Sequence, residues 1–339
     1  MKFSSRLYIL GCDLRLDTGE GFLANSIISE LKSSHDVLVY EDPIIHFLRM
    51  SNFARDRIQP IYIFFVGLLL LVRKKKVVVV NYIPIWNFLN SLLVRFGAQI
   101  GPVTGSVGIV PKESNFFDKF CREYLQVTLI HFFLKLCPRE IFLWAATPSV
   151  MCQFQEYKFR NLAFAFPFAS YIEELEVSDK KFDIFIYSSN HPIKNHPAML
   201  RALDILRADN YSICYVGPSL ERSYEGVTCY SNLSESEFNR HLASSKLYIS
   251  FSNEDAGITG MKALAYGLPV LCPLQSGLSF MTSFDQSYTY NDPYDSLEIA
   301  NKANYLLGKA SFFRDKSKRY FFKLRADSMR VLSKWSKAL

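Results

Sequence analysis

Short apolar runs alternate with helical patterns along most of the chain, and this alternation limits the folds that the chain can adopt. The run "KVVVVNY" at 76–82 has an unbroken apolar centre, and "FDIFIYSS", "YSICYVG" and "LYISFS" repeat the pattern in the second half. Stretches with helical spacing, such as "HPAMLRALDILRA", separate these runs. Strands that are apolar on both faces occur in parallel sheets that helices cover. The alternation therefore predicts α/β domains with doubly wound parallel sheets, whose ligands bind beyond the carboxyl ends of the strands.

The length of 339 residues suits two domains better than one. The polar, acidic segment "SYIEELEVSDKK" interrupts the alternation, as an interdomain linker does. We therefore expect an N-terminal domain at 1–170, a linker at 171–181, a second domain at 182–310 and a basic C-terminal helix at 311–339.

Cysteine usage and hydropathy exclude several classes of protein. The seven cysteines show no CxxC or Cys/His ligand spacing, which indicates reduced thiols rather than a disulfide framework or a metal site. No signal peptide is visible at the start of the chain. The longest apolar run, at 61–72, is shorter than the roughly 20 residues that a spanning helix needs, so we expect a buried helix there. The expected location is the cytoplasm.

The net charge of +7 is concentrated in the tail at 309–339 and in "RKKK" at 73–76. Aromatic residues interleave the basic residues of the tail, and a long helix with basic and aromatic residues is predicted at 115–136. These segments predict peripheral binding to an anionic membrane surface, while a merely solvated face on a docked helix stays open. No nucleic-acid module is visible, so a nucleic-acid partner is not expected.

The loop "SNEDAGITG" at 252–260 lies between a predicted strand and a predicted helix. A helix that begins near Ile258 or Thr259 presents free N–H groups to an anion such as phosphate. Gly257 and Gly260 would let a ligand approach the backbone, and Glu254 could accept hydrogen bonds from sugar hydroxyls. Simple capping of the helix stays open as the alternative, with three candidate residues: Ser252, Asn253 and Asp255.

The segment "EDAGITGMKALAYGLPV" at 254–270 resembles the donor-site signature of family-four glycosyltransferases with the GT-B fold. In that family a glutamate starts the segment, a glycine follows three residues later, a second glutamate stands at the eighth position, and Ala-x-Ala-x-Gly-x-Pro-Val completes it. This sequence matches at seven positions: Glu254, Gly257, Ala263, Ala265, Gly267, Pro269 and Val270. The turn "NHPIKNHPAML" resembles the family's phosphate-binding turn, with Lys194 at its lysine.

The resemblance implies a GT-B fold, in which two Rossmann-like domains face a cleft and the C-terminal helix packs back on the N-terminal domain. It implies a retaining, metal-independent transferase that uses a nucleotide-sugar donor as substrate and no cofactor. Glu254 would hold the donor sugar, and Lys194 would stabilise the departing diphosphate. The further donor-binding residues implied are Gly257, Ile258, Thr259, Lys262, Ser189 and Gly217. The acceptor side would use the glycine-rich segments with Gly19, Glu20, Gly21, Thr104 and Gly105.

Three features depart from the family pattern. Lys262 stands where the second glutamate usually holds the ribose, Ser189 stands where an arginine is expected, and no histidine follows the strands at 76–82 or 97–103. A lysine is donor-only, so Lys262 would contact phosphate or a carboxylated sugar rather than ribose hydroxyls. Two functions therefore stay open: an active transferase, and a non-catalytic GT-B subunit that binds a partner transferase or a glycan.

By analogy, the composition and the basic, aromatic helices suggest a bacterial enzyme of O-antigen or capsule synthesis. It would act on a lipid-linked glycan acceptor at the inner face of the cytoplasmic membrane. The sequence leaves the donor sugar, its nucleotide, the acceptor, the linkage, the catalytic base and the oligomeric state open.

Overall fold

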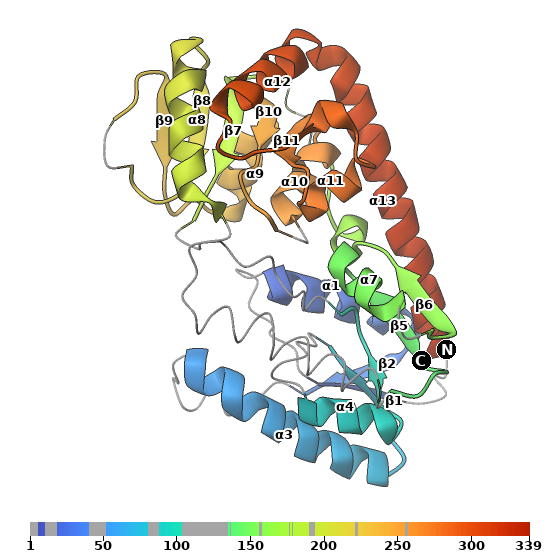
Figure 1. Ribbon diagram of the computed structural model, residues 1–339. Coiled ribbons are helices and arrows are strands. Elements are labelled where there is room, and N and C mark those ends of the chain that lie inside the picture. Colours follow the sequence, from blue (N-terminus) through green and yellow to red (C-terminus); the bar gives the residue numbers. More distant parts are fainter. Residues whose placement is uncertain are drawn as a thin grey trace. The chain divides into compact units, whose positions relative to one another are not determined.

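The computed structural model describes residues 6–10, 19–40, 52–80, 88–103, 135, 137–155, 158–175, 177, 179–189, 194–220, 223–254 and 257–339. These residues form two compact units (Figure 1). The first unit holds the described residues up to Phe168 together with Asp327–Leu339, and the second holds Ala169–Ala326. The segment 171–181 is grouped with the second unit.

The first unit contains a four-stranded parallel sheet in the order β2-β1-β3-β4. Its strands are β1 (Arg6–Leu10), β2 (Asp36–Val39), β3 (Lys76–Val79) and β4 (Gln99–Ile100). Among the described residues, three helices connect these strands: α1 (Gly19–Ser34), α3 (Asn52–Val72) and α4 (Phe88–Arg95).

Both faces of this sheet are covered. Leu10, Val77 and Val79 pack in one core cluster with apolar residues of α3 and α4. Ile9 and Val78 alternate with them along the strands, face the other way, and are also fully buried. Burial of both faces explains the unbroken valine run of β3, and it confirms the prediction of a parallel sheet covered by helices.

A smaller parallel sheet completes the first unit. It pairs β5 (Phe142–Ala145) with β6 (Asn161–Phe164), and α7 (Pro148–Gln155) lies between them in the chain. A single bridge from Val103 to Ala145 links the segment after β4 to β5. The two sheets therefore join through the backbone that follows β4.

The second unit contains a six-stranded, fully parallel sheet in the order β12-β11-β10-β7-β8-β9. Its strands are β7 (Phe182–Tyr187), β8 (Ile213–Val216), β9 (Val227–Tyr230), β10 (Ser245–Ile249), β11 (Val270–Pro273) and β12 (Thr289–Tyr290). The helices are α8 (His196–Ala208), α9 (Glu235–Ala243), α10 (Ile258–Ala265), α11 (Gly277–Met281) and α12 (Ser296–Gly308), with a short 3-10 turn, η4 (Gln286–Tyr288). Another 3-10 turn, η2 (Pro167–Ser170), begins in the first unit and ends in the second.

The strand order of this sheet reverses between β7 and β10. From β7 the chain proceeds through β8 to β9 on one side, and from β10 it proceeds through β11 to β12 on the other. The crevice at the carboxyl ends of two such strands is the usual ligand site of an open parallel sheet. The residues that follow β7 and β10 are therefore the ones that the topology favours for binding.

The last helix, α13 (Ala310–Ala338), contributes residues to both units. Its end docks on the first unit: the Trp335 indole Nε1 donates to the Ile100 carbonyl at 2.9 Å, and the Trp335 ring packs edge-on against Trp144 at a centroid distance of 6.1 Å. Both indoles are fully buried. The prediction that the C-terminal helix packs back on the N-terminal domain is confirmed.

The structure differs from the sequence-based expectation at α3. The apolar run 61–72 was expected to form a buried helix, but α3 starts earlier and keeps Phe65, Leu69 and Val72 exposed. No helix among the described residues is long and apolar enough to cross a membrane. The helix predicted at 115–136 lies almost entirely outside the described residues.

Candidate functional site

The side chains of Lys194 and Glu254 meet at the carboxyl ends of β7 and β10. The Lys194 Nζ atom lies 2.5 Å from Glu254 Oε1, and the two side chains are 10% and 32% exposed. Lys194 follows β7 and Glu254 follows β10, so the pair forms at the point where the strand order reverses. The structure thus brings together the two residues that the sequence analysis assigned to catalysis, and their catalytic role stays a prediction.

The ring of Tyr187 forms a wall of this site. Lys194 Nζ lies 4.7 Å from the ring centroid, a distance typical of a cation–π contact. Burial, and then the nearby negative charge of Glu254, raise the pKa of Tyr187. Phe238 of α9 packs edge-on against the same ring at 5.4 Å. The Lys194 ammonium is thereby held between an aromatic face and a carboxylate.

Two helices begin beside this pair with no side-chain cap. The cap residues Asn195 of α8 and Gly257 of α10 have left-handed backbones, with φ of 48° and 49°, and neither helix has a capping side-chain hydrogen bond. By contrast, Ser234 caps α9 and Asp295 caps α12. The first N–H groups of α10 can therefore bind an anionic ligand, whereas the first turn of α8 offers fewer donors because Pro197 has no N–H.

The capping alternative for the loop at 252–260 finds no support in its described part. The Ser252 hydroxyl accepts a hydrogen bond from the Glu254 N–H at 3.2 Å, so it stabilises the loop and does not cap α10. The Glu254 carbonyl accepts from the Gly277 N–H at 2.9 Å, which ties the loop to the start of α11. Asp255 lies outside the described residues.

The glycines of this loop make room for a protein side chain. A Cβ atom at Gly260 would lie 2.0 Å from Leu278 Cδ2, and one at Gly257 would lie 2.5 Å from the same atom. Leu278, in α11, is almost fully buried. Leu278 fills the space beside both glycines, which is a packing reason for a glycine at each position, and the expectation that Gly260 gives a ligand access to the backbone stays a prediction. The donor-binding roles of Gly257, Ile258 and Thr259 stay predictions.

Lys262 points toward α9. Its ammonium donates to the Glu235 carboxylate at 2.8 Å and to the Asn239 side-chain oxygen at 3.1 Å. The Lys262 side chain is 14% exposed and that of Glu235 is 58% exposed. The sequence analysis expected this ammonium to contact phosphate or a carboxylated sugar, and in this structure it is bound by α9. Donor binding by Lys262, which stays a prediction, would require the ammonium to leave these two oxygens.

Gly217 and Ser189 follow the neighbouring strands β8 and β7. A Cβ atom at Gly217 would lie 2.6 Å from the Tyr215 hydroxyl and 2.8 Å from the Ser188 carbonyl, so a glycine is required there for packing. The fully buried Tyr215 hydroxyl has no hydrogen-bond partner among the described residues. The Ser188 hydroxyl lies 3.3 Å from His196 Nδ1, so this contact links the residue after β7 to the first residue of α8. Donor binding by Ser189 and Gly217 stays a prediction.

The residues assigned to the acceptor side belong to the first unit. Gly19, Glu20 and Gly21 form the first turn of α1. Thr104 and Gly105 lie outside the described residues. The donor-side residues all belong to the second unit.

Within the described part of the chain, no cluster of three or more His, Cys, Asp or Glu side chains could hold a metal ion. The expectation of metal independence stays a prediction.

Sequence reasoning missed Tyr187, Glu235 and Asn239. Tyr187 is the last residue of β7, whereas the sequence analysis expected site residues only in the loops that follow the strands. An aromatic residue at the carboxyl end of a strand, close before a lysine, could have given the signal. Glu235 and Asn239 gave no such signal, since their role depends on how α9 packs beside α10.

No protein-family model matches this sequence, and no curated protein matches it. Solved structures, however, share its architecture over nearly the whole chain. Sucrose-phosphate synthase from Thermosynechococcus elongatus superposes with a TM-score of 0.70 at 12% identity, covering 98% of each chain. HepE from Anabaena, in complex with UDP-glucose, gives 0.66 at 11% identity and covers 98% of each chain.

WaaG, described as a glycosyltransferase involved in lipopolysaccharide biosynthesis, gives a TM-score of 0.62 at 14% identity, with 97% of this chain and 98% of that chain covered. These similarities show the fold, which is GT-B: two parallel-sheet α/β domains and a helical C-terminus. The prediction of the fold class is confirmed.

Proposed function

We propose that this protein is a glycosyltransferase that takes its sugar from a nucleotide-sugar donor. The observation that carries the proposal is the Lys194–Glu254 pair at the switch point of the second unit, beside two helix N-termini without side-chain caps. The fold supports it, because the structures that share it include a sucrose-phosphate synthase, WaaG, and HepE with bound UDP-glucose.

In this proposal the diphosphate of the donor binds where the N–H groups of α8 and α10 begin. When the bond between the sugar and the diphosphate breaks, negative charge develops on the leaving phosphate, and the Lys194 ammonium stabilises it. Glu254 accepts hydrogen bonds from hydroxyls of the donor sugar. The Tyr187 ring keeps the ammonium within the site, since a cation on an aromatic face keeps part of its stabilisation without water.

The finer assignments rest on the sequence resemblance. We propose that transfer retains the anomeric configuration, requires no metal ion, and delivers the sugar to a lipid-linked glycan in O-antigen or capsule synthesis. We also propose a peripheral location on the inner face of the cytoplasmic membrane, where such an acceptor resides.

Binding of UDP, measured by titration calorimetry, tests the donor site. Lys194→Ala should weaken UDP binding at least tenfold, because a cation in a poorly hydrated site interacts strongly with a diphosphate. Lys246→Ala is the matched control: its ammonium also pairs with a carboxylate, that of Asp183 at 2.8 Å, but at the opposite, amino ends of β10 and β7. Equal UDP affinity of both variants and the unaltered protein would overturn the phosphate role of Lys194.

The non-catalytic alternative is favoured by one observation, the engagement of Lys262 with Glu235 at the position where the family has its ribose-binding glutamate. The purified chain would then neither hydrolyse nor transfer from any sugar nucleotide, although it could bind a glycan or a partner transferase. A screen of sugar nucleotides for slow hydrolysis separates the two functions, because hydrolysis of any donor requires a chain that can break the sugar–phosphate bond.

A further inference from the structure

The outer face of α3 is apolar, whereas the outer face of a surface helix is normally polar. Phe65, Leu69 and Val72 are 64%, 51% and 73% exposed. Their spacing of four and three residues places them on one stripe of the helix. Ile63 and Leu70, on the inner face, are buried in the core against the sheet. The helix is therefore apolar on its solvent side as well as on its core side.

The neighbouring helix adds to this apolar surface. Helices α3 and α4 lie side by side (Figure 1) and touch where Gly67 meets the Leu93 side chain. Phe96, immediately after α4, is 60% exposed. Four large apolar side chains thus face solvent on one helix pair, although such residues are usually scattered singly on a soluble surface.

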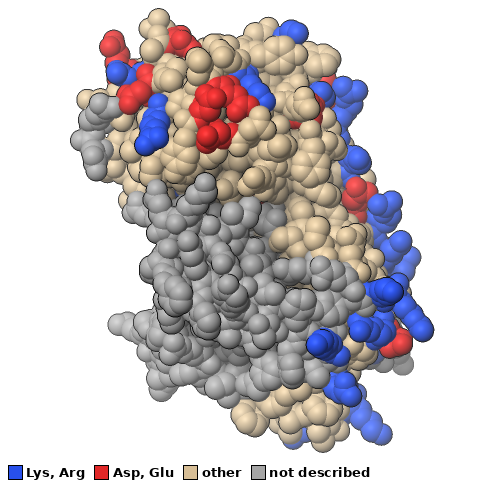
Figure 2. All heavy atoms as spheres, viewed as in Figure 1, with Lys and Arg blue, Asp and Glu red and all other residues tan. Residues whose placement is uncertain are grey.

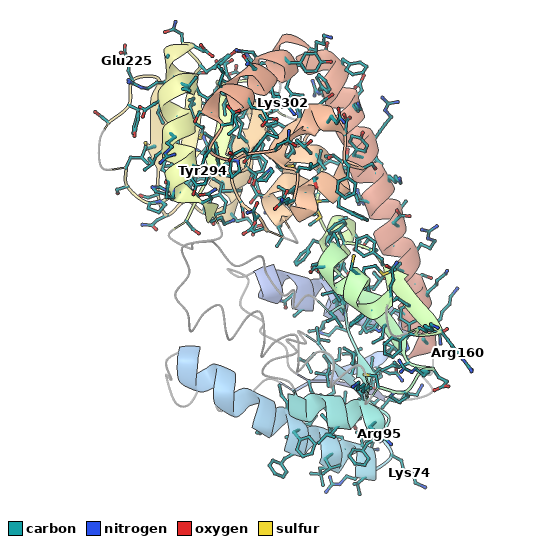
Figure 3. The ribbon with its side chains drawn as sticks, viewed as in Figure 1. Lys74, Arg95, Arg160, Glu225, Tyr294 and Lys302 are labelled. Carbon is teal, nitrogen blue, oxygen red and sulfur yellow. The ribbon has the colours of Figure 1, made fainter. Side chains whose placement is uncertain are left out.

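The charge around these side chains has one sign. Arg73, Lys74, Lys75 and Arg95 are exposed, and within the described chain none of them takes part in an ion pair. Figure 3 shows Lys74 and Arg95 at the same end of the helix pair. The sequence from 57 to 112 contains no Asp or Glu. Any surface that this segment contributes is uniformly cationic.

The basic face of α13, visible as a column of lysines and arginines in Figure 2, differs in this respect. Arg330 pairs with Asp327 at 2.6 Å, and Arg325 pairs with Glu174 at 3.6 Å. Carboxylates therefore neutralise part of the charge of α13.

We propose that the helix pair docks on a lipid bilayer that contains anionic lipid. The α3–α4 surface consists of Phe65, Leu69, Val72 and Phe96 with Arg73, Lys74, Lys75 and Arg95. The apolar side chains enter the boundary between headgroups and acyl chains, and the basic side chains bind the anionic headgroups, so α3 lies along the membrane and does not span it. Each basic residue contributes about a fivefold gain in affinity at such a surface. The proposal deepens the peripheral membrane location proposed above, and it can fail separately from the donor-site proposal, since no residue of the donor site takes part.

Co-sedimentation with vesicles tests the proposal. The full chain is mixed with phosphatidylcholine vesicles, and with vesicles in which about a third of the lipid is phosphatidylglycerol. We expect at least tenfold tighter binding to the anionic vesicles. Arg73→Glu/Lys75→Glu/Arg95→Glu should lower that binding by about 100-fold, and Phe65→Ser/Leu69→Ser/Val72→Ser should lower binding by at least tenfold. All six side chains are exposed, so an unchanged midpoint of thermal unfolding verifies the fold.

Arg319→Glu/Lys323→Glu/Lys334→Glu on α13 is the matched control, because it reverses the same number of exposed charges. Its binding to anionic vesicles should stay within about twofold of the unaltered protein. The proposal is overturned if the α13 variant loses binding while the α3–α4 variants keep it, or if neutral and anionic vesicles bind equally. It is also overturned if no vesicle binds and the serine variant changes the oligomeric state, which would make the surface a protein interface.

Discussion

The Lys194 ammonium lies 2.5 Å from the Glu254 carboxylate, so the cation that we assign to the donor diphosphate is bound by the carboxylate that we assign to the donor sugar. A donor must therefore compete with Glu254 for Lys194. Removing the charge of Glu254 should therefore raise the affinity for phosphate and lower the rate of transfer.

Glu254→Gln should lower the rate of transfer by about 100-fold or more, as the loss of one catalytic hydrogen-bonding group does. The same variant should bind UDP more tightly, since Lys194 loses its anionic competitor. Transfer assays and calorimetry measure the two effects. Asp183→Asn, at the equivalent pair on the amino ends of the strands, serves as the control and should change neither. Near-full activity of Glu254→Gln would show that the carboxylate only stabilises its loop.

Lys262→Glu should lower transfer and weaken the contact between α10 and α9, because it places a carboxylate beside that of Glu235. The cost in stability should not exceed about 1 kcal/mol, since Glu235 is largely exposed. The double variant Lys262→Glu/Glu235→Lys should recover the stability, because it restores an ion pair with the charges exchanged.

Transfer should not recover in that double variant if Lys262 serves the donor, since the donor role needs a cation on α10. Thermal unfolding and transfer assays on Lys262→Glu, Glu235→Lys and the double variant complete a double-mutant cycle. Complete recovery of transfer would limit Lys262 to holding α9 and α10 together.

Gly260→Ala should destabilise the second unit by about 1–3 kcal/mol, because its Cβ would lie 2.0 Å from a methyl group of the buried Leu278. The added alanine should cost less in a Leu278→Ala background, where the methyl group is absent. Gly308→Ala is the matched control: it ends α12, nothing lies within 4 Å of its Cβ position, and alanine is the better helix former. Urea unfolding measures the unaltered protein, Gly260→Ala, Leu278→Ala, their double variant and Gly308→Ala, and an equal effect of the two glycine substitutions would contradict the prediction.

Trp335→Ala should destabilise the first unit by about 3–5 kcal/mol, as removal of a large buried aromatic side chain does. Trp335→Phe should cost less, because it keeps most of the packing against Trp144 and loses the hydrogen bond to the Ile100 carbonyl. Lys337→Ala, on the exposed side of the same helix, should have no effect on urea unfolding. Unchanged stability of Trp335→Ala would mean that the end of α13 does not hold the first unit together.

Lys74→Gly should act on stability and on membrane binding with opposite signs. Lys74 lies two residues after the end of α3 and has a left-handed backbone with φ of 56°, a conformation that glycine adopts without strain. The substitution should raise stability by about 1 kcal/mol and lower affinity for anionic vesicles by about fivefold. Lys158→Gly, which relieves a similar backbone at φ of 51°, is the control and should change stability alone. Loss of vesicle binding in both variants would contradict a specific contribution of Lys74.

The sequence by itself determined the type of many of the described strands and helices and the fold class that they build, although it did not predict α12. Strands such as β3 have apolar residues at consecutive positions and therefore on both faces. This pattern can be read from the local sequence, and it is typical of a parallel sheet that helices cover on both faces. The short strands β6, β9 and β12 carry little such signal, because few residues cannot establish a period and the exposed residues of β9 break the apolar pattern.

Tertiary structure alone decided which residues meet. Lys194 and Glu254 come together because β10 pairs with β7, and strand order depends on long-range packing that no local pattern encodes. Gly260 accommodates Leu278, and Lys262 points toward Glu235, because neighbouring helices fix the free space and the direction of each side chain. The apolar run in α3 shows the same limit: its hydropathy was evident from the sequence, but only the packed helix shows that Phe65, Leu69 and Val72 face away from the core, since burial is a property of the whole fold.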